Sequence, residues 1–189
     1  MRLELVGGHY LDVLANRTGL ASMESALRLA RLKSGNYTIG HPLRLGAIAG
    51  GAENKLLLGF GEFGGWLGEA FQIHDDIIGV DGSAETTGKP VGDDLREGKL
   101  TTLSMFHNGQ GDGCGVQSAG RAARVLDLSE HDIGESRQII ARCGALDAVR
   151  DLLADRADRA LGVLAELPVG EAVKQPLRDL VDLCVGTAA

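Results

Sequence analysis

The sequence predicts an all-α fold, because helical periodicity dominates the chain and no convincing alternating strand pattern occurs in it. The segment over residues 146–167 is a clear example, with apolar residues on one face of an amphipathic helix. A glycine fingerprint after a strand is lacking, which argues against a nucleotide-binding α/β fold. With 189 residues and 44% hydrophobic content, residues 1–189 suffice for one domain with a sizeable core.

Three helices are predicted in the N-terminal part of the chain. The first covers residues 4–15, and because no N-cap residue precedes it, the pattern is typical of the later part of a helix. Ser22 can cap the second, whose apolar pattern runs to a stop at Gly35. The third follows His41-Pro42, because proline is tolerated in the first turn of a helix.

A long apolar segment over residues 54–79 predicts a buried helix. Glu62 and Glu69 interrupt it, so it is not a candidate membrane span. Each of its many glycines costs up to about 1 kcal/mol of helix propensity. Glycine at every third or fourth position also lets a neighbouring helix come close, which favours tight packing. These glycines are Gly59, Gly61, Gly64, Gly65 and Gly68.

Beyond this helix the pattern breaks. Polar, glycine-rich sequence over residues 81–98 predicts a loop, and a second glycine-rich stretch without helical pattern covers residues 108–120. Ser129 and Asp132 resemble a capping box and open a helix that ends at Cys143-Gly144.

The C-terminal helices are predicted over residues 129–185. A last helical segment lies between about residues 171 and 184, and Pro176 predicts a break or a restart within it.

Composition excludes several classes of function. The formal net charge of −7 argues against a nucleic-acid partner, which usually requires a basic face. Three widely spaced cysteines show neither metal-ligand spacing nor a disulfide framework, so a reduced cytoplasm is the expected compartment. The N-terminus lacks the apolar run of a signal peptide, and no stretch reaches the length of a membrane span.

Two adjacent carboxylates, Asp75 and Asp76, form the sharpest local feature of the sequence. They lie in Phe-Gln-Ile-His-Asp-Asp, at the C-terminal side of the apolar helix, where the helix dipole favours cations. A hard divalent cation would resolve this conflict, and Mg²⁺ typically takes one or two carboxylates plus substrate phosphate. The alternative is a solvated acidic helix end.

Two further segments offer cations for phosphate. Lys89 and Lys99 bound a glycine-containing polar segment, and lysine is a point-charge donor suited to phosphate oxygens. The alternative for this segment is a polar surface loop. Lys33-Ser34 lies at a predicted helix end, where a lysine can also simply complement the helix dipole.

Taken in order, these segments resemble one protein family. The series Gly-His-Tyr-Leu-Asp, Lys-Ser-Gly-Asn-Tyr-Thr, Gly-Glu-Ala-Phe-Gln-Ile-His-Asp-Asp and Thr-Gly-Lys-Pro-Val-Gly-Asp-Asp-Leu-Arg-Glu-Gly-Lys is similar to the second half of the trans-isoprenyl diphosphate synthases. It looks most like the bacterial geranylgeranyl-type enzymes. The specific motifs cover residues 3–103, and the resemblance continues to the C-terminus as helix pattern.

The resemblance implies an isoprenoid synthase-type helical bundle and a Mg²⁺-dependent prenyltransferase that joins an allylic diphosphate to isopentenyl diphosphate. The second Asp-rich motif of the family falls on Asp75 and Asp76, which implies metal ligands. Lysines that match Lys33, Lys89 and Lys99 contact the diphosphate in the family. The implied catalytic set is therefore Asp75, Asp76, Lys33 and Lys89, with Ser34, Gln72 and Lys99 among the substrate-binding residues.

The sequence departs from the family pattern at several positions. The last Asp of the usual D-D-x-x-D is Gly79 here, which leaves Asp81 and Asp94 as candidates to approach the metal. The family's Gln in the first segment is His9, and its Thr after the first lysine is Ser34. The glycine-rich stretch 108–120 replaces a clean apolar helix.

The largest departure is the first Asp-rich motif, which precedes the matched region and is not in this chain. We therefore expect the N-terminal helices of the bundle to be missing and the isolated chain to be inactive. The alternatives are a non-catalytic partner that regulates a full-length prenyl synthase, and a decayed truncated homologue. We expect a homo-oligomer or a heteromer with a full-length synthase. Lys33, Gln72, Asp75, Asp76 and Lys89 should face one concavity.

Overall fold

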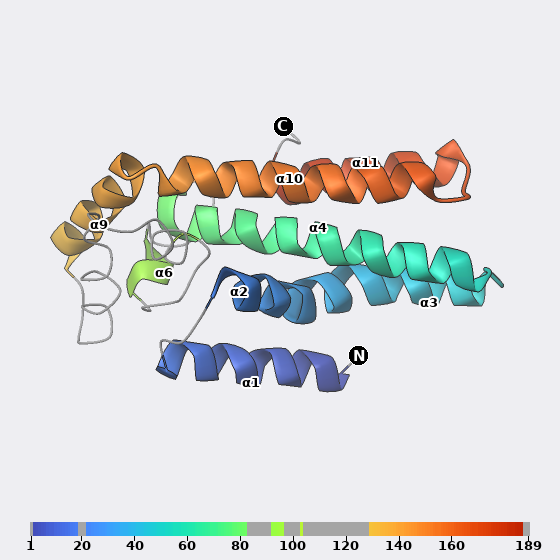
Figure 1. Cartoon of the computed structure of the whole chain (residues 1–189), viewed down its shortest axis with the longest axis horizontal. Coiled ribbons are helices and arrows are strands. Elements are labelled where there is room, and N and C mark those ends of the chain that lie inside the picture. The colour runs from blue at the N-terminus through green and yellow to red at the C-terminus, as the bar shows by residue number, and fades with distance from the viewer. Residues whose placement is uncertain (1, 19–21, 83–91, 97–102, 104–128, 187–189) are drawn as a thin grey trace. The chain divides into compact units, whose positions relative to one another are not determined.

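The computed structural model describes residues 2–18, 22–82, 92–96, 103 and 129–186, and every regular element in these ranges is a helix (Figure 1). This confirms the all-α prediction. None of the described helices is long and apolar enough to cross a membrane. The elements are α1 (Arg2–Thr18), α2 (Met23–Ala30), the π-helix η1 (Arg31–Gly40), α3 (His41–Ala49), α4 (Asn54–Asp81), α6 (Asp93–Arg96), α9 (Glu130–Arg142), α10 (Ala145–Glu166) and α11 (Glu171–Val185).

The chain forms two compact units. The first unit comprises Met1–Leu11, Leu27–His74 and Leu152–Ala189, and the second comprises Asp12–Ala26 and Asp75–Asp151. Helices α1, α2, α4 and α10 contribute residues to both.

Helix α2 begins where the sequence predicts. The backbone N–H of Ser25 donates to Ser22 Oγ at 3.1 Å, and the N–H of Ser22 donates to Ser25 Oγ at 2.8 Å. These reciprocal bonds satisfy donors that the first turn of a helix leaves without partners.

The predicted stop at Gly35 is wrong. The chain continues through η1 to Gly40 and enters α3 without a break, with Pro42 in the first turn of α3 as predicted. Gly35 and Gly40 are both buried. Their packing against α4 outweighs the tendency of glycine to end a helix, because this contact needs residues without side chains.

Glycines bring the backbones of η1 and α4 together. A Cβ built on Gly35 would lie 2.9 Å from the carbonyl oxygen of Gly64 and 3.2 Å from the Cα of Gly68. A Cβ on Gly64 would lie 2.6 Å from the backbone nitrogen of Gly40. Real Cβ atoms essentially never approach other atoms within 3.0 Å, so Gly64 and Gly68 of α4 serve tight helix packing, as the sequence predicts for this helix. Gly65 does not, because a Cβ there would meet nothing within 4 Å.

The core of the first unit lies among α4, α10 and α11. Phe63 and Leu67 of α4 are fully buried and belong to one cluster with buried residues of the two C-terminal helices. Burial of each large apolar side chain contributes about 1.5–3 kcal/mol relative to exposure. The buried members from α10 and α11 are Ala157, Ala160, Leu164, Leu177, Val181 and Cys184.

Pro176 does not break α11, so that prediction is wrong. The proline is exposed, and the helix runs through it from Glu171 to Val185. The next residue, Leu177, and Val181 one turn later are buried in the core. Their packing offsets the backbone hydrogen bond that the proline cannot donate.

In the second unit, the predicted capping box opens α9. Asp132 N–H donates to Ser129 Oγ, and Ser129 N–H donates to the Asp132 carboxylate at 3.0 Å. These hydrogen bonds from Ser129 hold the pKa of Asp132 below its ordinary value. The helix ends at Arg142, and Gly144 follows with a positive φ of 73°.

The segment predicted as a loop over residues 81–98 is partly helical. Helix α4 reaches Asp81, and α6 forms a short helix over Asp93–Arg96. The glycine-rich stretch 108–120 lies outside the described residues. Helix α6 contacts α9 through an ion pair between Arg96 and Glu130. A Cβ on Gly92, which has a positive φ of 75°, would also press on Ile133 of α9. Such contacts outweigh the polar composition that favours a loop.

Helix α1 presents apolar side chains to solvent. Leu3, Val6 and Tyr10 are 87%, 65% and 67% exposed. Their spacing of three and four residues puts them on one face of the helix.

We expect this face to make the isolated chain self-associate, because contiguous exposed apolar surface favours association. Sedimentation equilibrium should show species heavier than a monomer, and Leu3→Gln with Val6→Gln should shift the distribution toward monomer. A matched pair of changes at polar exposed positions, Glu171→Gln with Gln175→Glu on α11, should leave the distribution as it is. A monodisperse wild-type monomer would contradict the expectation.

Candidate functional site

Two of the predicted substrate-binding residues meet in the first unit. Ser34 Oγ of η1 donates to Gln72 Oε1 of α4 at 3.0 Å, and Ser34 is buried. Lys33 precedes Ser34 and is half-buried. A Cβ on Gly8 of α1 would lie 3.3 Å from Lys33 Cγ, so the backbone of α1 runs close to the lysine stem. The Gly-His-Tyr-Leu-Asp segment, which contains Gly8, therefore lies next to the Lys-Ser segment at Lys33, and Ser34 of that segment bonds to Gln72.

The two predicted metal ligands follow on α4. Asp75 and Asp76 come three and four residues after Gln72, within one helical turn. Asp75 is exposed, whereas Asp76 is only 4% exposed. Both belong to the second unit, and Lys33 and Ser34 belong to the first. The predicted common concavity of these residues therefore stays a prediction.

Lys89 and Lys99 lie outside the described residues. Their predicted contacts with a diphosphate stay predictions.

Asp81 and Asp94 are the two candidates to replace the aspartate that the family pattern has at Gly79, and the structure places them differently. Asp81 forms ion pairs with Arg137 at 3.0 Å and with Arg150 at 3.8 Å. Asp94 of α6 instead lies against Gly79, because a Cβ built on Gly79 would be 2.6 Å from Asp94 Cγ. Helix α6 thus delivers a carboxylate to the place on α4 where the family pattern has an aspartate.

The types of side chain at the two predicted ligands suit a magnesium ion that shares its coordination with phosphate, and the site itself stays a prediction. Within the described ranges, no three or more His, Cys, Asp and Glu side chains are arranged to hold a metal ion together. Asp75 and Asp76 are adjacent carboxylates on α4, which continues beyond them to Asp81, and the first is exposed whereas the second is buried. Mg²⁺ is commonly bound through one or two carboxylates together with substrate phosphates, so a pair is sufficient.

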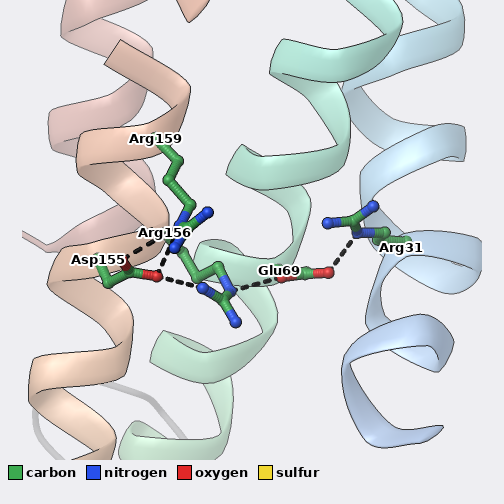
Figure 2. A network of polar contacts seen from close by, with 5 residues as sticks. All are labelled: Arg31, Glu69, Asp155, Arg156 and Arg159. Carbon is green, nitrogen blue, oxygen red and sulfur yellow. Dashed lines mark hydrogen bonds and ion pairs between the residues drawn. The ribbon is translucent and has the colours of Figure 1, made fainter. Parts of the chain in front are cut away.

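A buried ionic network lies three residues before Gln72 and was missed by the sequence analysis (Figure 2). Glu69 of α4 is 3% exposed and pairs with Arg31 of η1 on one side. On the other side it pairs with Arg156 of α10, whose Nε lies 2.7 Å from Glu69 Oε2. No spacing within one helix could have revealed these partners, because they come from two other helices.

The network continues along α10 and encloses the chain's one tryptophan. Arg156 and Arg159 both contact Asp155, and the hydrogen bond from Arg159 holds the pKa of Asp155 below its ordinary value. Trp66 of α4 is covered by guanidinium groups, at 4.4 Å for Arg31, 5.3 Å for Arg156 and 5.0 Å for Arg159. These distances are within the range of cation–π attraction.

Known proteins with similar sequences are prenyl diphosphate synthases. The geranylfarnesyl diphosphate synthase of Aeropyrum pernix is 35% identical over 184 residues, which is 95% of this chain and 55% of that protein. The heptaprenyl diphosphate synthase component 2 of Geobacillus stearothermophilus is 33% identical over 161 residues, 84% of this chain and 48% of that protein. The chain thus spans about half the length of the curated relatives it matches.

Solved structures agree with this relationship. A geranylgeranyl pyrophosphate synthase from Corynebacterium glutamicum, complexed with isoprenyl diphosphate and magnesium, has a TM-score of 0.89 and 33% sequence identity. The match covers 98% of this chain and 52% of that one. The model of the polyprenyl synthetase family matches residues 1–113, which contain the sequence motifs that bear on the site. The helical fold, these motifs and the similarity together show that the chain belongs to the polyprenyl synthetase family.

Proposed function

We propose that this chain supplies the diphosphate-binding half of a prenyltransferase that condenses an allylic diphosphate with isopentenyl diphosphate in the presence of Mg²⁺. The observation that carries the proposal is the hydrogen bond between Ser34 and Gln72. It joins two motifs that are 38 residues apart in sequence and that both match diphosphate-binding segments.

The proposed roles follow from the chemistry of the leaving group. Ionisation of an allylic carbon–oxygen bond places negative charge on the departing diphosphate, and fixed cations lower that barrier. Lys33 donates to phosphate oxygens from η1, and the hydrogen bond to Gln72 orients the neighbouring Ser34 hydroxyl. Asp75 and Asp76 would hold Mg²⁺, which when bound supplies further positive charge to the diphosphate. Lys89 and Lys99 are proposed to contact the same group.

A second candidate function is that of a partner subunit. One relative is named as component 2 of a heptaprenyl diphosphate synthase, and the face of α1 with Leu3, Val6 and Tyr10 is exposed. In this case the chain pairs with a full-length prenyl synthase and regulates its assembly or product length without turnover of its own.

Calorimetric titration of the purified chain with Mg²⁺ and inorganic pyrophosphate tests the binding proposal. We expect saturable binding that requires Mg²⁺. Asp76→Asn and Lys33→Ala should each weaken it by about tenfold or more, as expected for the loss of a ligand or of a charged hydrogen-bond donor. Asp158→Asn, at an exposed position of α10, is the matched control and should leave the affinity unchanged. Absence of binding, or an affinity that neither Asp76→Asn nor Lys33→Ala changes, would refute the proposal.

Incorporation of radiolabelled isopentenyl diphosphate with several allylic primers separates the two candidate functions. We expect no product from the chain alone, because only one Asp-rich motif is present in it. Addition of a full-length homologue should change product amount or length if the chain is a partner subunit. Product from the pure chain, free of host synthase, would show that the remaining motifs are sufficient.

A further inference from the structure

We propose that Glu69 is a positioning residue for diphosphate binding, because it clamps the π-helix that carries Lys33 and Ser34. The inference rests on the proposed function for its consequence, since Lys33 and Ser34 are the groups that bind phosphate there. Glu69 itself is buried and acts through η1.

The π-helix is the element that needs to be held. Helix η1 extends over ten residues, Arg31–Gly40, whereas π-helical turns in proteins are mostly single and often lie at functional sites. The C-terminal end of η1 shows the hydrogen-bond pattern of a π-helix, because the N–H of His41 donates to the carbonyl of Asn36, five residues earlier. A return to ordinary α-helical bonding would turn Lys33 and Ser34 about the helix axis and away from Gln72.

Two side-chain contacts fix η1 to α4 at the start of the π-helix. Arg31 donates to Glu69, and three residues later on both helices Ser34 donates to Gln72. The direct backbone contact of Gly35 with α4 follows immediately. The Arg31–Glu69 contact is therefore the first of three attachments, and it lies two residues from Lys33.

Burial and charge make Glu69 a strong clamp. Its side chain is 3% exposed, and its two oxygens face Arg31 and Arg156, so it needs both cations to offset the loss of solvation. Arg156 is itself only 14% exposed and belongs to α10 in the core of the first unit. Through Glu69, the start of η1 is tied to two helices instead of one.

Glu69→Gln tests the proposal, with Glu62→Gln as the matched control. Glu62 lies on the same helix but is exposed. We expect Glu69→Gln to speed hydrogen exchange of the backbone amides over residues 34–41 while exchange in α11 is unchanged. It should also weaken binding of Mg²⁺ and inorganic pyrophosphate by about tenfold, as for loss of a hydrogen bond to a charged group. Fluorescence of Trp66 should shift as its arginine cover loosens.

A double-mutant cycle distinguishes positioning from general destabilisation. If Glu69 acts through the η1 residues, Glu69→Gln should lower pyrophosphate affinity much less in a Ser34→Ala background than in the wild type. Arg31→Gln, which removes the partly exposed partner and leaves the Glu69–Arg156 pair, provides a milder variant and should change exchange and affinity in the same direction.

Three results would overturn the inference. They are unchanged exchange over residues 34–41 in both variants, unchanged affinity despite faster exchange, and an equal loss of affinity with and without Ser34. A wild-type chain that binds no pyrophosphate would instead refute the proposed function and with it the consequence for binding. Hydrogen exchange would then still decide whether Glu69 holds the π-helix.

Discussion

Gly68→Ala should destabilise the chain by about 3 kcal/mol, the upper part of the usual range for overpacking a tight core contact. The added Cβ would overlap the Cα and the backbone nitrogen of Gly35. Backbone atoms of a helix cannot rotate out of the way as a flexible side chain can, so η1 must separate from α4. Chemical denaturation followed by circular dichroism measures the loss of unfolding free energy.

Gly65→Ala is the matched control for this change. Gly65 lies three residues earlier on the same helix, and a Cβ there would meet nothing within 4 Å. Because glycine inside a helix is destabilising by roughly 0.5–1 kcal/mol relative to alanine, this variant should be more stable than the wild type. Equal effects of the two substitutions would contradict the direct contact between Gly68 and Gly35.

Gly79→Asp should lower stability by about 1–3 kcal/mol by overpacking and should not improve binding of Mg²⁺ and pyrophosphate. The change restores the D-D-x-x-D pattern in sequence. In the structure, however, the new Cβ would fall 2.6 Å from Asp94 Cγ, and the new carboxylate would meet one that is already there. Like charges repel at such distances, so the Asp94 side chain must turn away from Gly79 or α6 must shift on α4. Thermal denaturation and calorimetric titration measure the two effects.

Moving the carboxylate tests this explanation. The double variant Gly79→Asp with Asp94→Gly should recover most of the stability that Gly79→Asp loses, because the clash is removed. Gly134→Asp on α9, where a Cβ would meet nothing within 4 Å, controls for the effect of an aspartate in a helix. Improved pyrophosphate binding by Gly79→Asp alone would show that Asp94 does not occupy the position.

The sequence by itself determined the features that depend on neighbours in the chain. The capping bonds of Ser22 and Ser129 join residues three apart, so the starts of α2 and α9 could be read from short segments. Amphipathic spacing predicted α10, and the Phe-Gln-Ile-His-Asp-Asp segment marked Asp75 and Asp76 as the candidate metal ligands. Local hydrogen bonds and helical periodicity need no information about the rest of the fold.

Only the tertiary structure decided what happens where local preference and packing disagree. Gly35 and Pro176 are local signals to stop or break a helix, yet both lie within helices, because the packing of η1 on α4 and of α11 in the core outweighs them. The same holds for function. Glu69 gains its partners from η1 and α10, and Asp94 reaches Gly79 from α6, through contacts between residues far apart in sequence that no spacing along one helix encodes.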